Sequence, residues 1–354
     1  MQTYLHTISP IEHCLLAALS RGLHLDASAE RTSPMGLIGL WRDVDFGALL
    51  RLARIHAVEG VVWDGLVGLH QDGVIEALPA SDEWARRVGE VVQTYDKQLA
   101  VVHRLADFYA CHNVPMMLLN GYGVSRCYPR PELRPSGDVD LWLYGEQETA
   151  DALLHNALGV AVLREKSGQS LFRLDGVLVE NHHRLPEAEV LGGCCDREVE
   201  VAVNQKVEVV RLPDADLGAV YLLRHLAIKF RTKWLKLRHI ADWAMYVRAH
   251  HVEISWSKVE KSAVRFGFLP FLKALNRVVV DELGADRSWI PAELISQTQD
   301  NEFWEELLHP RFPYKLSEDA PWLRRKVFGV MRWKVNRWKR RYAQKRLLTA
   351  VNKC

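Results

Sequence analysis

The chain has 354 residues, of which 48% are hydrophobic and 25% are charged, and its formal net charge is +2. This composition is typical of a globular protein and excludes a disordered or fibrous chain. Because positive and negative charges nearly balance, the overall charge favours no class of partner, neither nucleic acid nor lipid surface.

The N-terminal region, residues 1–112, has the sequence pattern of helices. Ser9 is a candidate N-cap, because Pro10 follows at the first helical position and Glu12 stands at the third. A long amphipathic run extends from residue 81 to residue 113. We therefore predict that this region consists of helices.

Residues 113–213 change to short apolar segments, which are typical of a compact α/β core. Residues 114–120 are apolar and lead into a Gly-Tyr-Gly turn, which predicts a buried strand. Asp175 and Gly176 form a two-residue hairpin turn between two strand-like runs. The other predicted elements are a strand at 138–144, a helix at 146–158, and strands at 198–203 and 206–212.

Helical spacing returns in residues 214–310, the predicted C-terminal helical region. Arg238 and Asp242 are four residues apart, which favours an ion pair on one helix face over a contact with substrate. His225 and Lys229 have the same spacing, and either line the substrate cleft or serve packing. The predicted helices are 214–230, 237–251 and 256–283.

Two aspartates, Asp138 and Asp140, interrupt an otherwise apolar strand, although strands disfavour aspartate. Alternate residues of a strand share a face, so these carboxylates point the same way, with α-carbons about 6–7 Å apart. Like charges so placed repel each other unless a cation lies between them. A hard divalent ion fits because it prefers carboxylate oxygens. The alternative is a pair of exposed carboxylates at the edge of a strand.

A longer motif surrounds the two aspartates. An apolar strand is followed by a glycine, a Tyr-Pro pair, an arginine and a Gly-Asp-x-Asp stretch: Gly121, Tyr128, Pro129, Arg134, Gly137, Asp138, Val139, Asp140 and Leu141. A second stretch contains Glu180, His182 and Arg184. Together these stretches resemble the uncharacterised nucleotidyltransferase family of bacteria, and the similarity extends over about residues 10 to 300.

The resemblance implies an α+β fold, a nucleotidyltransferase-type mixed β-sheet core with flanking helices between helical N- and C-terminal regions. It implies a Mg²⁺- or Mn²⁺-dependent enzyme that moves a nucleoside monophosphate, or a related phosphate-linked group. The donor would be a nucleoside triphosphate or a nucleotide sugar. The acceptor stays open among a glycan, a lipid-linked molecule and a peptide product. The alternative is an inactive protein of the same fold that acts as an adaptor at a membrane surface.

Enzymes of this kind use two metal ions about 3.5–4 Å apart. We expect Asp138, Asp140 and Glu180 to be the metal-binding and catalytic residues, because the strand of Glu180 can return beside that of the aspartates. The alternative for Glu180 is a surface position in the hairpin. The residues expected to contact the nucleotide are Asn120, Gly121, Gly123, Ser125, Arg134, Gly137 and His182, since a glycine turn offers backbone N–H groups to phosphates.

Some residues leave alternatives open. Asn120 stands where the family has lysine, which removes a positive charge from the phosphate side and favours the adaptor alternative. Arg134 either clamps a phosphate or pairs with an acidic neighbour. His182 and His183 are adjacent in a strand and point to opposite faces, which argues against a zinc site.

The C-terminal tail, residues 311–354, is basic and aromatic. Residues 322–346 contain eleven Arg or Lys and no Asp or Glu. A basic amphipathic helix with aromatic residues can lie on an anionic membrane, which is the partner that we expect. The alternatives are an acidic protein, packing against the chain's own core, and nucleic acid, which is the least expected.

The chain shows no signal for export. The N-terminus lacks the pattern of a signal peptide, and no apolar run approaches the ~18 residues of a membrane span. The six cysteines form no Cys-x-x-Cys pair and no zinc spacing: Cys14, Cys111, Cys127, Cys194, Cys195 and Cys354. We therefore expect free thiols and a cytoplasmic protein, peripheral to the membrane if the tail binds lipid.

Overall fold

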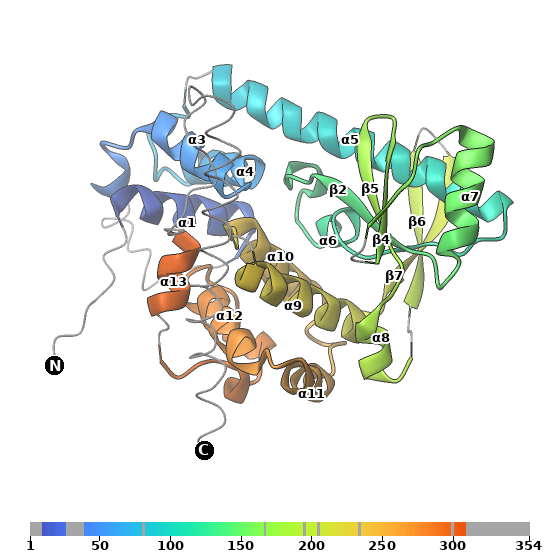
Figure 1. Cartoon of the computed structure of the whole chain (residues 1–354). Coiled ribbons are helices and arrows are strands. Elements are labelled where there is room, and N and C mark those ends of the chain that lie inside the picture. Colours follow the sequence, from blue (N-terminus) through green and yellow to red (C-terminus); the bar gives the residue numbers. More distant parts are fainter. Residues whose placement is uncertain are drawn as a thin grey trace, which may run out of the picture.

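The described part of the chain combines one mixed β-sheet with helices on both of its faces and a helical body at one end (Figure 1). In this computed structural model, the described residues are 9–25, 39–79, 82–165, 168–193, 196–203, 206–232, 235–298 and 301–308. The C-terminal tail, residues 311–354, lies outside the described residues.

Among the residues described before the sheet, four helices are present: α1 (Pro10–Gly22), α3 (Phe46–Ile55), α4 (Glu59–Gln71) and α5 (Asp82–Cys111). The predicted start of α1 is confirmed, since the Ser9 amide donates a hydrogen bond to the Glu12 carboxylate at 2.8 Å. Helices α1 and α4 pack at very short range, because a Cβ on Gly65 would lie 1.7 Å from the carbonyl oxygen of Ala18. Glycine is therefore required at this helix crossing.

Within the described residues, seven strands form the sheet in the order β3-β4-β5-β2-β1-β7-β6. The strands β2 and β5 are parallel, as are β1 and β7, and the other neighbours are antiparallel. Their bounds are β1 (Met117–Leu118), β2 (Asp138–Trp142), β3 (Leu163–Glu165), β4 (Gln169–Leu174), β5 (Val177–His182), β6 (Asp196–Val203) and β7 (Lys206–Pro213).

One group of helices lies between the strands, and a second group follows the sheet. The first group is α6 (Tyr122–Ser125), the 3₁₀ turn η1 (Pro131–Leu133), α7 (Gln147–Leu158) and α8 (Pro186–Leu191). The second group is α9 (Ala215–Thr232), α10 (Leu237–His250), α11 (Trp256–Phe266), α12 (Leu269–Asp281), η2 (Arg287–Trp289), η3 (Ala292–Leu294) and α13 (Asn301–Leu308).

Alternation along the strands gives the sheet two different faces. Val139, Leu141 and Val179 are fully buried on the face that packs against α5 and α7. The opposite face carries Asp140 and Glu180 and is covered by apolar residues of α8 and α9. The carboxylates are thus placed between the sheet and helices α8 and α9.

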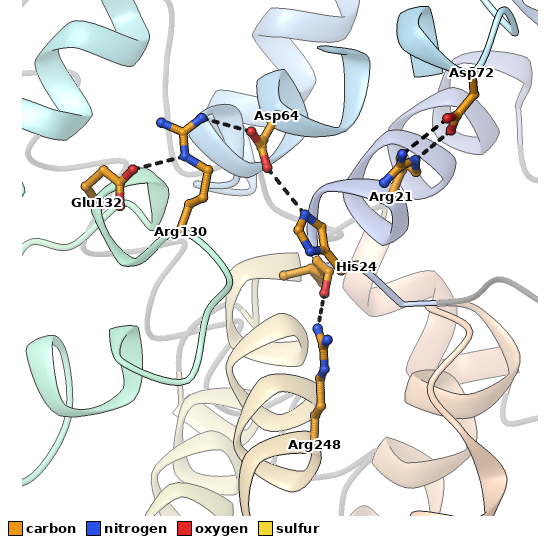
Figure 2. A network of polar contacts seen from close by, with 8 residues as sticks. Arg21, His24, Asp64, Asp72, Arg130, Glu132 and Arg248 are labelled. Atoms are coloured by element: carbon orange, nitrogen blue, oxygen red, sulfur yellow. Dashed lines mark hydrogen bonds and ion pairs between the residues drawn. The ribbon is translucent and has the colours of Figure 1, made fainter. Parts of the chain in front are cut away.

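A chain of polar contacts ties the loop before β2 to the N-terminal helices (Figure 2). The Arg130 guanidinium lies 3.0 Å from the Asp64 carboxylate on α4, and Asp64 also faces His24 at 3.9 Å. Arg248 of α10 donates a hydrogen bond to the carbonyl oxygen of Leu23 at 2.8 Å. These contacts fix the position of the loop from which β2 starts.

The predicted fold class and the order of elements are confirmed. The helix predicted at 256–283 divides into α11 and α12, because Gly267 has a φ of 72° and ends the first helix. The elements β3, α6 and α8 were not predicted. No described helix is long and apolar enough to cross a membrane. Among the described cysteines, Cys14, Cys111 and Cys127 are free thiols, as expected.

Candidate active site

Three side chains with metal-ligating atoms meet on the covered face of the sheet. Asp140 lies on β2, and Glu180 and His182 lie on the neighbouring strand β5. The parallel register places Asp140 opposite Glu180 and Trp142 opposite His182, so all these side chains share one face. One ligand atom of each of Asp140, Glu180 and His182 lies within 4.8 Å of the other two.

The donor set fits one divalent ion. Ligand atoms bound to the same ion are at most about 4.6 Å apart, because each bond measures roughly 2.0–2.3 Å. The three ligand atoms lie within 4.8 Å of one another, so small side-chain movements bring all three within bonding distance of one ion. Asp138 lies two residues before Asp140 on the same face of β2, opposite Leu178, and does not belong to the three-residue cluster.

The charges of the two aspartates influence each other. Burial raises the pKa of Asp138, and the neighbouring Asp140 carboxylate raises it further. Burial would also raise the pKa of Asp140, but the hydrogen bond and charge of His182 outweigh it, so this pKa is lowered. The bond joins His182 Nε2 and Asp140 Oδ1 at 3.0 Å. Asp140 is therefore the carboxylate that the site keeps ionised.

Helix α9 lies over the acidic residues. The Tyr221 ring meets the His182 ring edge-on at 6.2 Å and stacks on His225 at 6.1 Å. The Tyr221 hydroxyl is buried and has no hydrogen-bond partner among the described residues. Burial, and then the charge of Lys229, lower the pKa of His225 to about 3, so this imidazole is neutral at physiological pH.

The glycine turn after β1 lies against the first aspartate. Gly121 has a φ of 62°, and a Cβ there would lie 2.8 Å from the carbonyl oxygen of Asp138. Asn120 is only 8% exposed, and its Nδ2 lies 3.4 Å from His225 Nε2. Ser125 is buried and donates its hydroxyl to the carbonyl oxygen of Tyr122 at 2.7 Å.

The remaining glycines of the expected nucleotide site are less constrained. A Cβ on Gly123 would meet the carbonyl oxygen of Leu118 at 3.4 Å, which is ordinary van der Waals contact. Gly137 is exposed, and a Cβ there would have no neighbour within 4 Å. The turn therefore has one obligatory glycine, Gly121.

Gly121→Ala is expected to destabilise the protein and to lower activity. A positive φ disfavours alanine, and its methyl group would collide with the strand that carries Asp138. Thermal unfolding should show a loss of at least about 1 kcal/mol, since left-handed backbone costs about that much for a residue with a Cβ. Gly137→Ala is the matched control, and an equal effect of both substitutions would contradict the argument.

The ion pair expected between Arg238 and Asp242 is not formed, and Arg134 takes the second of its two alternatives. Asp242 pairs with Arg134, at 2.6 Å from Oδ1 to Nε and 2.9 Å from Oδ2 to Nη2, and not with Arg238. Arg238 instead donates to the carbonyl oxygen of Pro135 at 2.9 Å. Arg134 is only 2% exposed, so its guanidinium is buried with Asp242. The structure therefore favours the ion-pair alternative over a contact with nucleotide.

Two residues of the site were not singled out from the sequence. Gln169 lies opposite His182 in the hairpin, and its Nε2 is 3.1 Å from His182 Nδ1. A two-residue turn at Asp175 and Gly176 already implies this register, so the sequence contained the signal. Tyr221 comes from α9, and only the packing of that helix on the sheet places it near the carboxylates.

The mixed sheet, with acidic residues on neighbouring parallel strands, is the arrangement that the resemblance to nucleotidyltransferases implies. Residues 42–281 match the family described as uncharacterised nucleotidyltransferase, and the chain belongs to this family. The expectation of an enzyme of this class is thereby confirmed at the level of the family. A comparison with curated proteins gave no match.

Two solved structures are similar to parts of the chain. One is the antibiotic-resistance factor ANT(2'')-Ia, at 15% identity and a TM-score of 0.34, covering 48% of this chain and 91% of the other. The other is an antigenic nucleotidyltransferase-like protein from Paracoccidioides brasiliensis, at 14% identity and a TM-score of 0.34, covering 53% of this chain and 92% of the other.

Proposed function

We propose that the chain transfers a nucleoside monophosphate, or a related phosphate-linked group, from a nucleotide donor to an acceptor hydroxyl or phosphate. The observation that carries the proposal is the parallel register of β2 and β5, which places Glu180 beside Asp140. Together with His182, these residues offer a donor set that fits a divalent ion such as Mg²⁺ or Mn²⁺. Such an ion, when bound, activates the attacking oxygen and stabilises the leaving one.

The protein's own residues have separate roles in this proposal. Asp138 and Asp140 supply the negative charge that holds cations, and Glu180 orients or deprotonates the acceptor. The turn of Gly121 and Gly123 receives the phosphates with its backbone N–H groups.

Positive charge near the aspartates supports turnover despite the family lysine being replaced by Asn120. The charges of Arg238 on α10 and Lys229 on α9 both act to lower the pKa of Asp138, so both lie close to it. In this proposal, these cations interact with donor phosphates bound near Asp138. The C-terminal helices thus supply the kind of charge that position 120 lacks.

Each labelled nucleoside triphosphate, incubated with Mn²⁺ or Mg²⁺ and a cell extract as the source of acceptor, should give pyrophosphate and a labelled product. Glu180→Gln should lose most of this transfer and still bind nucleotide, because the amide cannot accept a proton. Glu165→Gln, on the exposed edge strand β3, is the matched control. Nucleotide binding without any transfer by the wild-type protein would instead support the adaptor alternative.

We further propose that the basic segment 322–346 binds anionic membranes. Each basic residue near such a surface contributes about 1 kcal/mol, and salt screens the attraction over roughly 8 Å. The full-length protein should therefore pellet with anionic liposomes at low salt and be released at high salt, whereas a chain ending at Asp319 should not pellet. Binding to RNA but not to liposomes at the same salt would contradict the membrane proposal.

A further inference from the structure

The third member of the candidate metal cluster is an imidazole and not a carboxylate. His182 Nε2 lies 3.0 Å from Asp140 Oδ1, and the ring shares the 4.8 Å cluster with Glu180. The second aspartate, Asp138, is outside this cluster. The atoms that meet on the sheet are therefore two carboxylate oxygens and one imidazole nitrogen.

The other nitrogen of the ring has a partner that can fix its protonation. Gln169 lies opposite His182 across β4 and β5, and its side-chain amide is 3.1 Å from Nδ1. An amide can present either its oxygen or its nitrogen at nearly the same position. With the oxygen turned toward the ring, Nδ1 donates its proton to Gln169, and the lone pair of Nε2 is available to an ion.

The surroundings of the ring also point to a ligand. The Tyr221 ring lies against His182, and its buried hydroxyl has no hydrogen-bond partner among the described residues. Burial raises the pKa of this hydroxyl, and the negative charge of Asp140 raises it further. A cation or its bound water at the cluster would satisfy this group.

We propose that His182 is a metal ligand, that Gln169 is the positioning residue that sets its tautomer, and that the site prefers Mn²⁺ to Mg²⁺. This inference rests on the proposed function, because it specifies the ion of the same site. Mg²⁺ strongly prefers oxygen ligands and keeps several waters. Imidazole is a better ligand for first-row transition metals than for Mg²⁺, and carboxylates suit Mn²⁺, so two carboxylates with one imidazole match Mn²⁺ better than Mg²⁺.

The test measures metal binding without turnover. Mn²⁺ is titrated into the full-length protein in the absence of nucleotide and followed by electron paramagnetic resonance, with Mg²⁺ as competitor. Pulsed measurements detect the magnetic coupling of a directly bound ¹⁴N. The wild-type protein should show this coupling, and His182→Gln should lose it together with the preference for Mn²⁺. Gln169→Leu should weaken Mn²⁺ binding about 10- to 100-fold, as is typical when the partner of a ligating histidine is removed.

The neighbouring histidine provides a matched control. His183 Nε2 contacts the Ser170 hydroxyl at 2.7 Å and does not belong to the metal cluster, so His183→Gln should keep the nitrogen coupling and the metal preference. Wild-type protein that binds Mn²⁺ without nitrogen coupling would overturn the inference, even if His182→Gln fails to fold. An unchanged ratio of Mn²⁺ to Mg²⁺ affinity in folded His182→Gln would overturn it as well.

Nucleotide transfer is measured separately on the same samples. Transfer without nitrogen coupling would refute the role of His182 and leave the proposed function intact. Nitrogen coupling in a protein that transfers no nucleotide from any donor would support the metal site and refute the proposed function.

Discussion

Asp140→Asn should abolish nucleotide transfer, with a loss of at least about a thousandfold, because a metal ion's stabilisation of the transition state is worth several kcal/mol. Asp140 is 3% exposed, is hydrogen-bonded to the His182 imidazole and lies opposite Glu180 on the neighbouring strand. Asparagine keeps the shape but removes the charge that a cation requires. Transfer assays and calorimetric Mn²⁺ binding with nucleotide present measure the effect.

The same variant should remain folded. Removing one of two neighbouring negative charges relieves the repulsion between Asp138 and Asp140, which partly offsets the lost bond to His182. Asp72→Asn, at the exposed end of α4, makes the same chemical change away from the site and should leave transfer intact. If Asp140→Asn binds metal and transfers nucleotide as well as the wild type, the acidic cluster is not the active site.

The sequence was sufficient to predict the part of the site that depends on strand geometry. Alternation along β2 places Asp138 and Asp140 on one face, and this placement does not depend on how the surrounding helices pack. The hairpin turn at Asp175 and Gly176 limits how the next strand can return, and the structure places Glu180 opposite Asp140. Strand patterning and turn chemistry are local, so one sequence contains them.

The helices over the site could not be positioned in this way. The spacing of Arg238 and Asp242 satisfies the local rule for an ion pair, but Arg134, 108 positions earlier in the chain, forms a two-bond contact with Asp242 instead. A planar guanidinium bonded twice to a buried carboxylate is worth more than an i,i+4 pair. Contacts between residues far apart in the chain, such as that of Tyr221 with His182, depend on how the helices pack on the sheet. The periodicity of the sequence does not reveal this packing.

Asp242→Asn should be among the most destabilising single substitutions, with a loss of about 3–5 kcal/mol, because it leaves a buried guanidinium without its counter-charge. Both partners are 2% exposed, and the carboxylate also accepts the Tyr128 hydroxyl at 2.7 Å. Chemical unfolding at neutral pH measures the loss. Asp72→Asn is the matched control, because its partner Arg21 is on the surface and such pairs contribute at most about 1 kcal/mol.

The pH dependence of stability gives a second measure of this pair. Burial would raise the pKa of Asp242, but the charge and hydrogen bonds of Arg134 outweigh it, so the pKa in the folded protein is lowered. The carboxylate therefore stabilises the fold fully above its unfolded pKa of about 3.9, and this contribution is lost as the pH falls below that value. Asp242→Asn should remove this part of the acid dependence.

Replacing both partners, as in Arg134→Met with Asp242→Leu, should recover much of the stability at neutral pH, because neither partner of the pair is then buried as a lone charge. A single variant as stable as the wild type would show that the buried pair does not stabilise the fold.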